Sequence, residues 1–319
     1  MLVHLSLNVP SDLSSAVTDE LLACAAVTNV AVIPAASLRP VGDLISADVA
    51  RETASDLLSA LEGLGLAERG GITLSIPSGA PFEAAKDIDR CAVGDPDDAV
   101  VWDILVEQAN DAARPTLSYL VFLILAVALA AVAVITDSSI LVVGAMVIGP
   151  EFATVAAICT GFALCDFSVA RRSFLVLVAS FVFAALVVAL IALAARGVGV
   201  LGPEAVTRAR PQTQFIWQPT VWSVVVALLA GAAGVLALSV QKAQAMVGVF
   251  ISVTTVPAAG SFALALGLWV PSEMGGAAIQ LGLNLVGMIT SGTLTLIVQR
   301  RAWHHVQKAF RPVLRRGRA

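Results

Sequence analysis

A proline and a glutamate stand side by side inside a long apolar stretch of this sequence. The stretch, "SSILVVGAMVIGPEFATVAAICTG", runs from Ser138 to Gly161, with Pro150 and Glu151 near its middle. A proline inside a helix removes a backbone hydrogen bond and breaks the helix, and a carboxylate at membrane depth is costly and marks a functional site. The pair therefore indicates a broken membrane helix with an ionisable group at the break.

The chemistry expected of Glu151 depends on the position of Pro150. We expect Pro150 to lie in the first turn of a new half-helix, where its missing N–H would be unpaired in any case. Glu151 would then lie at the positive end of a helix dipole, which favours the carboxylate, whereas burial favours the protonated form. This competition suits a proton-coupling or cation-binding site that faces Thr154 and the Thr254-Thr255 pair. The alternative is a neutral carboxyl group that serves structure alone.

A second apolar stretch, "VGVFISVTTVPAAGSFALALGLW", has Pro257 near its middle. When Pro150 and Pro257 are aligned, small and hydroxyl residues fall at matching positions, such as Thr154 beside Ser261. Each half of the membrane region would hold three spans, so the second copy must lie upside down. Inverted repeats with broken helices are a known transporter plan, with the site near the membrane midplane.

Polar residues gather around the two predicted breaks. Gln280 and Asn284 are four residues apart, so they share one face of their helix. The cluster indicates a lined pathway for a substrate or ion, although two ordinary kinks in a bundle packed through small residues would also fit. The predicted pathway residues are Glu151, Pro150, Thr154, Ser252, Thr254, Thr255, Pro257, Gln280 and Asn284.

The composition indicates a membrane protein with a separate polar part. The chain has 319 residues, of which 58% are hydrophobic and 13% charged. Six apolar runs are long enough to span about 30 Å of hydrocarbon. We therefore predict an α-helical polytopic membrane domain over residues 117–298, built as two inverted three-helix repeats with broken middle helices. The six runs are 117–135, 140–165, 173–195, 221–240, 246–268 and 277–298.

Charge predicts the orientation of the spans. Both termini of six spans lie on one side, and basic residues favour the cytosolic side. Arg171, Arg172 and Lys242 would lie in inner loops, and the tail from residue 299 to 319 holds seven basic residues and no acid. Three further arginines in the loop after the third span depart from this rule. We expect a multi-pass protein of the bacterial inner membrane with both termini in the cytosol.

The basic tail is a candidate for contact with the bilayer. Basic residues just beyond a span attract anionic lipid headgroups. The alternatives are pairing with the acidic head and a plain anchor at the end of the last span. The predicted lipid-contacting residues are Arg300, Arg301, Lys308 and Arg311.

The N-terminal head is acidic and has the pattern of a small α+β domain. Residues 1–116 hold six Lys or Arg and eighteen Asp or Glu. Residues 1–80 read twice as strand, helix and strand, which predicts a ferredoxin-like βαββαβ layout, with Ser11 and Asp12 as caps of the first helix. Residues 81–116 read as a linker with one short amphipathic helix. The head would be either a docking module or a ligand-sensing regulatory domain.

Residue patterns typical of catalysis or metal binding are missing from the sequence. The four cysteines have no paired spacing, and the three histidines lie far from the apolar stretches or in the tail, which argues against a disulfide framework and a zinc site. There is no nucleophile elbow, P-loop or glycine-rich dinucleotide motif. We therefore expect no enzymatic activity, no cofactor or metal, and no nucleic-acid partner.

Several stretches of the chain resemble a known family. They are "DSSILVVGAMVIGPEF", the arginine pair after the second span, and "GDLISADVARETASDLLSALEGLGL" in the head. They resemble the bacterial membrane family catalogued as domain of unknown function 389, and the GAM-x-x-x-P core at Gly144–Pro150 is the most specific part. The Pro257 region has Pro-Ala where the family has Pro-Pro. The likeness covers roughly residues 1–300 and implies an integral membrane protein.

Two functions from different classes remain open. The first is a secondary transporter or channel for a small solute or ion, with a cytosolic regulatory head and its pathway at Pro150 and Pro257. The second is a membrane-anchored sensor or scaffold whose spans only anchor and oligomerise the chain. An intramembrane enzyme ranks last, because paired carboxylates and metal clusters are missing from the spans. Abundant small residues favour a homo-oligomer in either case.

Overall fold

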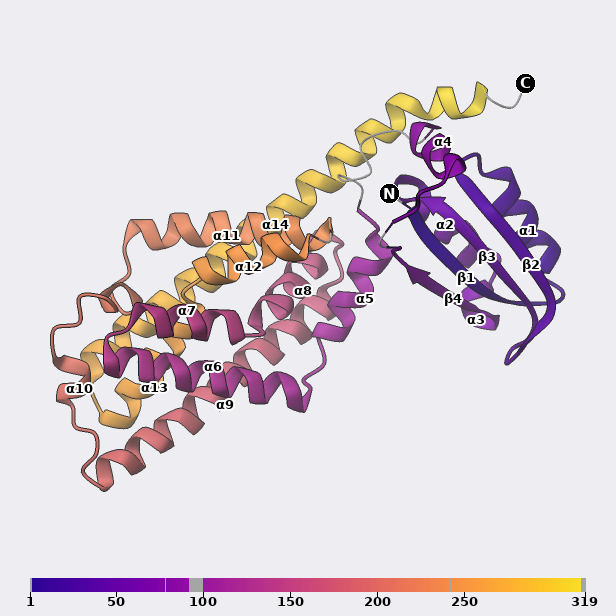
Figure 1. Ribbon diagram of the computed structural model, residues 1–319. Coiled ribbons are helices and arrows are strands. Elements are labelled where there is room, and N and C mark those ends of the chain that lie inside the picture. The colour runs from indigo at the N-terminus through magenta and orange to yellow at the C-terminus, as the bar shows by residue number, and fades with distance from the viewer. Residues whose placement is uncertain (1, 78, 92–99, 241, 317–319) are drawn as a thin grey trace. The chain divides into compact units, whose positions relative to one another are not determined.

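The computed structural model describes residues 2–77, 79–91, 100–240 and 242–316 (Figure 1). Of these, the side chains at 86, 89–91, 243–244 and 303–316 lie outside the description. The chain divides into two compact units. The head unit comprises Met1–Leu105 and Arg300–Ala319, and the membrane unit comprises Val106–Gln299.

The head unit contains a four-stranded antiparallel sheet with the strand order β2-β3-β1-β4. Apolar residues alternate along the strands as the sequence predicts: Leu5 and Leu7 of β1 are fully buried, whereas Ser6 between them is half-buried. An N-terminal antiparallel sheet is therefore confirmed. The strands are β1 (Leu2–Pro10), β2 (Val27–Leu38), β3 (Val41–Ala50) and β4 (Gly71–Ser75).

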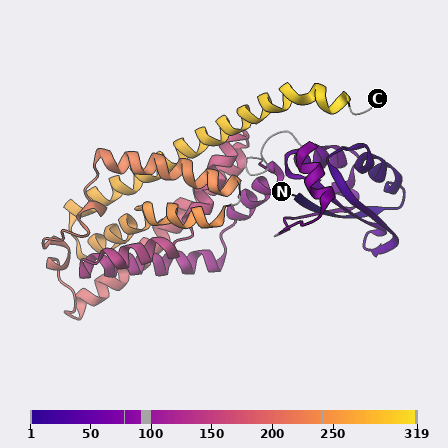
Figure 2. The ribbon, with the colours of Figure 1, turned by 45° about the horizontal axis from the view of Figure 1, so that its top comes forward.

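The helices of the head unit supply the other side of its core. Leu21 of α1 and Leu61 of α2 belong to the same buried cluster as Leu5 and Leu7, so both helices pack on one face of the sheet (Figure 2). Two helices fall in the predicted linker, α4 and α5, where the sequence indicates one. The helices are α1 (Ser14–Ala23), α2 (Arg51–Gly63), α3 (Leu66–Arg69), α4 (Glu83–Cys91) and α5 (Trp102–Ala112), and α5 continues into the membrane unit.

The predicted cap of the first helix is wrong. The helix begins at Ser14 and its cap residue is Leu13, without a side-chain hydrogen bond. Asp12 instead accepts a hydrogen bond from Arg69 at 2.7 Å, and this bond holds the pKa of Asp12 below its ordinary value. The carboxylate pairs with a distant cation, which local sequence does not reveal.

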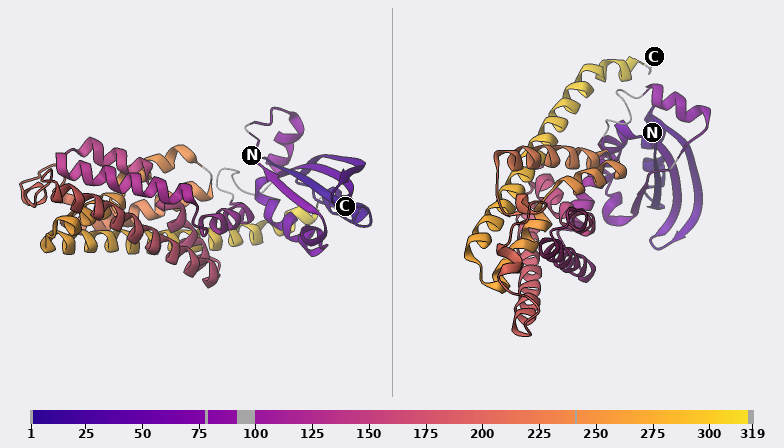
Figure 3. Two further views of the ribbon diagram at one scale, coloured as in Figure 1. Left: turned by 90° about the horizontal axis from the view of Figure 1, so that it is seen from below. Right: turned by 60° about the vertical axis from the view of Figure 1, so that its left-hand side comes forward.

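The membrane unit is a bundle of long apolar helices (Figure 3). Within the described residues, five helical stretches are long and apolar enough to cross a membrane, and the pair α7 and α8, bent by 54°, makes a sixth span if it is counted as one. A multi-pass membrane protein is therefore confirmed. Its elements are α6 (Leu117–Thr136), α7 (Ser139–Ile148), α8 (Glu151–Ala163), α9 (Phe167–Gly197), α10 (Glu204–Thr207), η1 (Gln214–Ile216), α11 (Val221–Ser239), α12 (Ala243–Ser252), α13 (Thr255–Leu268) and α14 (Pro271–Arg316).

Two spans are longer than their apolar runs predict. Helix α9 begins at Phe167 rather than residue 173, because Asp166 caps it by accepting from the backbone N–H groups of Ser168 and Val169. Helix α14 begins at Pro271 rather than residue 277. Hydropathy marks where a span enters the hydrocarbon, whereas capping and backbone hydrogen bonds decide where its helix begins.

Glycines let the helices of the membrane unit approach closely. A Cβ built on Gly260 of α13 would lie 2.5 Å from Cβ of Ala130 and 2.9 Å from the backbone nitrogen of Ala131, both on α6. Gly267 of α13 meets α9 in the same way, at the backbone oxygen of Ala189. These small residues therefore allow close helix packing within the unit, as small residues commonly do in membrane proteins.

We expect Gly260→Ala to lower the free energy of unfolding by about 1–3 kcal/mol, because the added methyl group meets backbone atoms of α6 that cannot yield easily. Gly282→Ala is the matched control, since nothing lies within 4 Å of a Cβ at that position on α14. The control should be neutral or stabilising by up to about 1 kcal/mol. Thermal unfolding in one detergent compares the two, and an unchanged midpoint for Gly260→Ala would contradict tight α6–α13 packing.

Candidate functional site

The first predicted break lies where the sequence places it. Helix α7 ends at Ile148, Gly149 follows in an extended conformation, and α8 begins at Glu151 with Pro150 as its cap residue. The prediction of a new half-helix is confirmed, with Pro150 one position before the first helical residue rather than in the first turn. The position suits proline because the first N–H groups of a helix have no partner within it.

The second break lies earlier than predicted. Helix α12 ends at Ser252 and α13 begins at Thr255, so Pro257 is the third residue of α13 rather than the point of interruption. The early part of a helix tolerates proline for the same reason as above. A proline in a membrane span therefore marks the start of the second half-helix, and the break precedes it.

The two breaks meet at one hydrogen bond. The Thr255 hydroxyl donates to Oε1 of Glu151 at 2.7 Å, and the two residues are the first of α13 and α8. Glu151 is 6% exposed and Thr255 is fully buried. The starts of two half-helices, with their positive dipole ends, therefore face the same carboxylate. The predicted approach of Glu151 to Thr255 is seen in the structure.

Glycine at position 149 leaves room for this carboxylate. A Cβ on Gly149 would collide with Oε2 of Glu151 and would lie 2.7 Å from Cγ2 of Val256. The Oε2 atom itself is buried and has no hydrogen-bond partner among the described residues. One oxygen of the carboxylate therefore joins the two breaks, and the other is free to take a partner from outside the described part of the chain.

Two amide side chains of α14 lie at the second break. The Thr254 hydroxyl accepts from Nδ2 of Asn284 at 2.7 Å and from Nε2 of Gln280 at 3.2 Å. Nε2 of Gln280 also approaches Oδ1 of Asn284 at 3.4 Å. The amides are 1% and 3% exposed, for Gln280 and Asn284 respectively. The expected common face of these two residues thus meets the break directly.

Two of the predicted pathway residues make other contacts. The Thr154 hydroxyl donates to the hydroxyl oxygen of Tyr119 on α6 at 3.2 Å, rather than to Glu151. The Ser252 hydroxyl donates to the backbone oxygen of Val249 in its own helix at 2.7 Å. The sequence analysis did not predict a role for Tyr119. It is the single tyrosine of the chain and lies near the start of an apolar span, and this could have marked it as a candidate polar contact.

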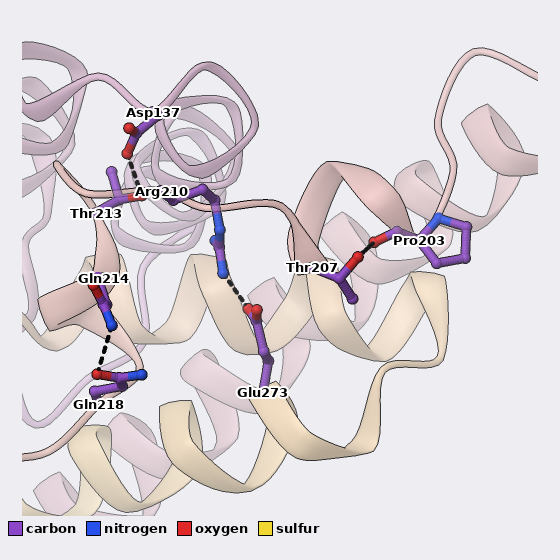
Figure 4. A network of polar contacts seen from close by, with 8 residues as sticks. All are labelled: Asp137, Pro203, Thr207, Arg210, Thr213, Gln214, Gln218 and Glu273. Atoms are coloured by element: carbon purple, nitrogen blue, oxygen red, sulfur yellow. Dashed lines mark hydrogen bonds and ion pairs between the residues drawn. The ribbon is translucent and has the colours of Figure 1, made fainter.

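A second buried polar cluster lies in the loop between α9 and α11 (Figure 4). Arg210 forms an ion pair with Glu273 at the start of α14, and each residue is 4% exposed. Near this pair, the Thr213 hydroxyl donates to Oδ1 of Asp137 at 2.9 Å. The loop thereby fastens the end of α6 and the beginning of α14, contacts that the sequence analysis did not predict.

The remaining arginines of this loop region bind helix ends. Arg196 donates from Nη1 to the backbone oxygen of Leu268 at 2.9 Å, and Arg208 donates to the backbone oxygen of Ile135. These oxygens belong to the last turns of α13 and α6, which carry partial negative charge and lack partners within the helix. The basic residues that depart from the charge rule therefore have a structural role at helix ends.

The predicted lipid-contacting residues lie in the C-terminal part of α14. Arg300 and Arg301 are exposed. The side chains of Lys308 and Arg311 lie outside the described residues. Contact of these four residues with lipid stays a prediction.

The fold and the polar groups at the breaks define a multi-pass membrane protein. Residues 146–290 match the sequence profile of a family described as "Domain of unknown function (DUF389)". The resemblance is thereby confirmed over these residues, which include both breaks and the amides of α14. The head lies outside the matched residues, so its likeness to the family stays a prediction. No curated protein and no solved structure matches the chain.

We expect Arg210→Met to lower the free energy of unfolding by about 3–5 kcal/mol, because it leaves Glu273 buried without its cation. The double variant Arg210→Met/Glu273→Met removes both charges and should recover most of this loss. Arg171→Met, at an exposed arginine, is the matched control and should change little. Thermal or denaturant unfolding gives the comparison, and no recovery in the double variant would contradict a stabilising role for the ion pair.

Proposed function

We propose that the protein is a secondary transporter or channel for a small solute or ion, with its pathway at the two helix breaks. The observation that carries the proposal is the hydrogen bond between Glu151 and Thr255, which joins the starts of two half-helices inside the membrane unit. A buried carboxylate is expensive in a bilayer. Its placement where two membrane helices are interrupted favours a role in moving charge or solute.

The inverted repeat belongs to this proposal. In each half, a helix of ten residues is followed by a break and a half-helix of 13 or 14 residues, namely α7 and α8 in the first half and α12 and α13 in the second. Helix α7 packs against both α12 and α13. These matching lengths and contacts support two copies of one three-span unit, arranged upside down relative to each other.

The head would regulate transport. Its element order β1-α1-β2-β3-α2-α3-β4 and sheet order β2-β3-β1-β4 support the ferredoxin-like layout, with α3 as an added short helix. The alternative is a membrane-anchored sensor or scaffold whose spans only anchor and oligomerise the chain. A homo-oligomeric, non-enzymatic protein of the bacterial inner membrane is part of either proposal.

The proposed orientation places both termini in the cytosol and the loop between α13 and α14 outside. In a variant without native cysteines, Ser272→Cys should react with an impermeant maleimide added to intact cells, because Ser272 is exposed in the first turn of α14, next to that loop. Asp19→Cys, exposed on α1 of the head, should react only after the cells are opened. The reverse pattern would contradict the orientation.

We expect Glu151→Gln to abolish the dependence of flux on pH or cations in liposomes, because glutamine retains the size and hydrogen bonding of the side chain but does not ionise. Tyr119 is the other ionisable side chain near the first break, where its hydroxyl group contacts Thr154. Tyr119→Phe removes this hydroxyl group and shows how much of any pH dependence comes from it. Glu204→Gln, at an exposed loop carboxylate, is the matched control and should transport like the unaltered protein.

The outcome decides between the two functions. Flux that responds to pH in the unaltered protein and in Glu204→Gln, but not in Glu151→Gln, supports transport with Glu151 as the coupling group. Unaltered flux of Glu151→Gln across the pH series rules out the coupling role. Absence of any flux from the unaltered protein, for a panel of inorganic ions and small solutes, favours the sensor or scaffold.

A further inference from the structure

Two buried oxygen atoms near the helix breaks lack hydrogen-bond donors among the described residues. They are Oε2 of Glu151 and Oε1 of Gln280, and their side chains are 6% and 1% exposed. Buried polar atoms are nearly always paired, so each unpaired one requires an explanation. Two such acceptors in one polar cluster could both be satisfied by a single bound cation.

The two acceptors belong to a single connected cluster. Thr255 donates to Glu151, and the adjacent residue Thr254 accepts from Gln280 and Asn284. Both groups therefore lie around the same short segment of backbone between α12 and α13. The cluster brings together a carboxylate from α8, an amide oxygen from α14 and the hydroxyl oxygens of Thr254 and Thr255 at the start of α13.

The helix ends at the breaks add further oxygen atoms. The last turns of α7 and α12 end at the breaks, and the final carbonyl groups of a helix have no partner within it. Such carbonyls carry partial negative charge and coordinate cations in broken-helix transporters. The donor set is thus made of hard oxygen ligands, which suit alkali and alkaline-earth cations.

Charge and space narrow the choice of cation. The described residues of the cluster supply one carboxylate, so one positive charge is balanced, whereas a divalent cation would leave a net charge buried in low dielectric. The carboxylate is closely enclosed, since a Cβ on Gly149 would meet both Glu151 and Val256. Backbone carbonyls at the ends of half-helices coordinate Na⁺ in broken-helix transporters, which favours Na⁺ as the monovalent cation.

We propose that Glu151 and Gln280, with the Thr254-Thr255 segment, bind one Na⁺ ion at the helix breaks. The inference deepens the proposed transport function by naming the coupling ion, and it rests on the role given there to Glu151. The ion would pair with Oε2 of Glu151 and Oε1 of Gln280, which have no hydrogen-bond partner among the described residues. Thr255 would hold the carboxylate in place through its other oxygen.

Binding of ²²Na⁺ to the purified full-length protein in detergent tests the proposal directly. We expect saturable binding of one ion per chain, competed by unlabelled Na⁺ at least about tenfold better than by K⁺, a difference of about 1.4 kcal/mol. N-methylglucamine should not compete. The melting temperature should rise with Na⁺ at constant ionic strength, because a ligand that binds only the folded state stabilises it.

Variants locate the binding site. Glu151→Gln should lose saturable binding, and Gln280→Met should weaken it about tenfold or more, since it removes one ligand of ordinary hydrogen-bond strength. Glu204→Gln should bind like the unaltered protein. Glu151→Asp keeps the charge on a shorter side chain and should bind more weakly than the unaltered protein, which keeps the test valid if Glu151→Gln fails to fold.

The outcomes separate this inference from the proposed function. If the unaltered protein binds no Na⁺, or if Glu151→Gln and Gln280→Met leave binding unchanged, the sodium site is wrong, even where flux depends on pH through Glu151. If Na⁺ binds with the expected losses in the variants but liposomes show no flux, the site stands and the transport proposal fails.

Discussion

A membrane protein must satisfy its backbone and polar groups from within, because hydrocarbon supplies no hydrogen bonds. Two helix breaks inside the bundle make this constraint acute, since each frees backbone groups that an unbroken helix would pair. The contact between Glu151 and Thr255 ties the two interruptions to each other. Helix α7 also packs against α12 and α13, so the helices of both breaks lie together inside the bundle.

The same constraint explains the loop between α9 and α11. Helix ends at a membrane surface present unpaired carbonyl groups, and Arg196 and Arg208 bind such groups at Leu268 and Ile135. Arg210 adds a buried ion pair with Glu273. These arginines are exceptions to the rule that basic residues gather in cytosolic loops. Their contacts with helix ends and with Glu273 explain why they occur in this loop. Long loops of membrane proteins thus contribute to the polar framework of the bundle.

The sequence reveals elements better than contacts. Hydropathy locates the spans, proline and glutamate locate the first break, and the spacing of Gln280 and Asn284 identifies a polar face that the structure places at Thr254. The rotation of each helix about its axis is not readable from one sequence, and for this reason the bond from Thr154 to Tyr119 was missed. The pairing of Arg210 with Glu273 was missed because it joins residues 63 positions apart.

The bond between the two breaks also has a consequence for biosynthesis. Its partners are 104 residues apart in the chain, and ribosomes add about 5–20 residues per second, so Glu151 emerges roughly 5–20 s before Thr255. During that interval, Glu151 has been synthesised but Thr255, which donates a hydrogen bond to it, has not. A chain that ends before Thr255 therefore lacks the contact that joins the two breaks, so this feature of the membrane unit is made only when both halves are present.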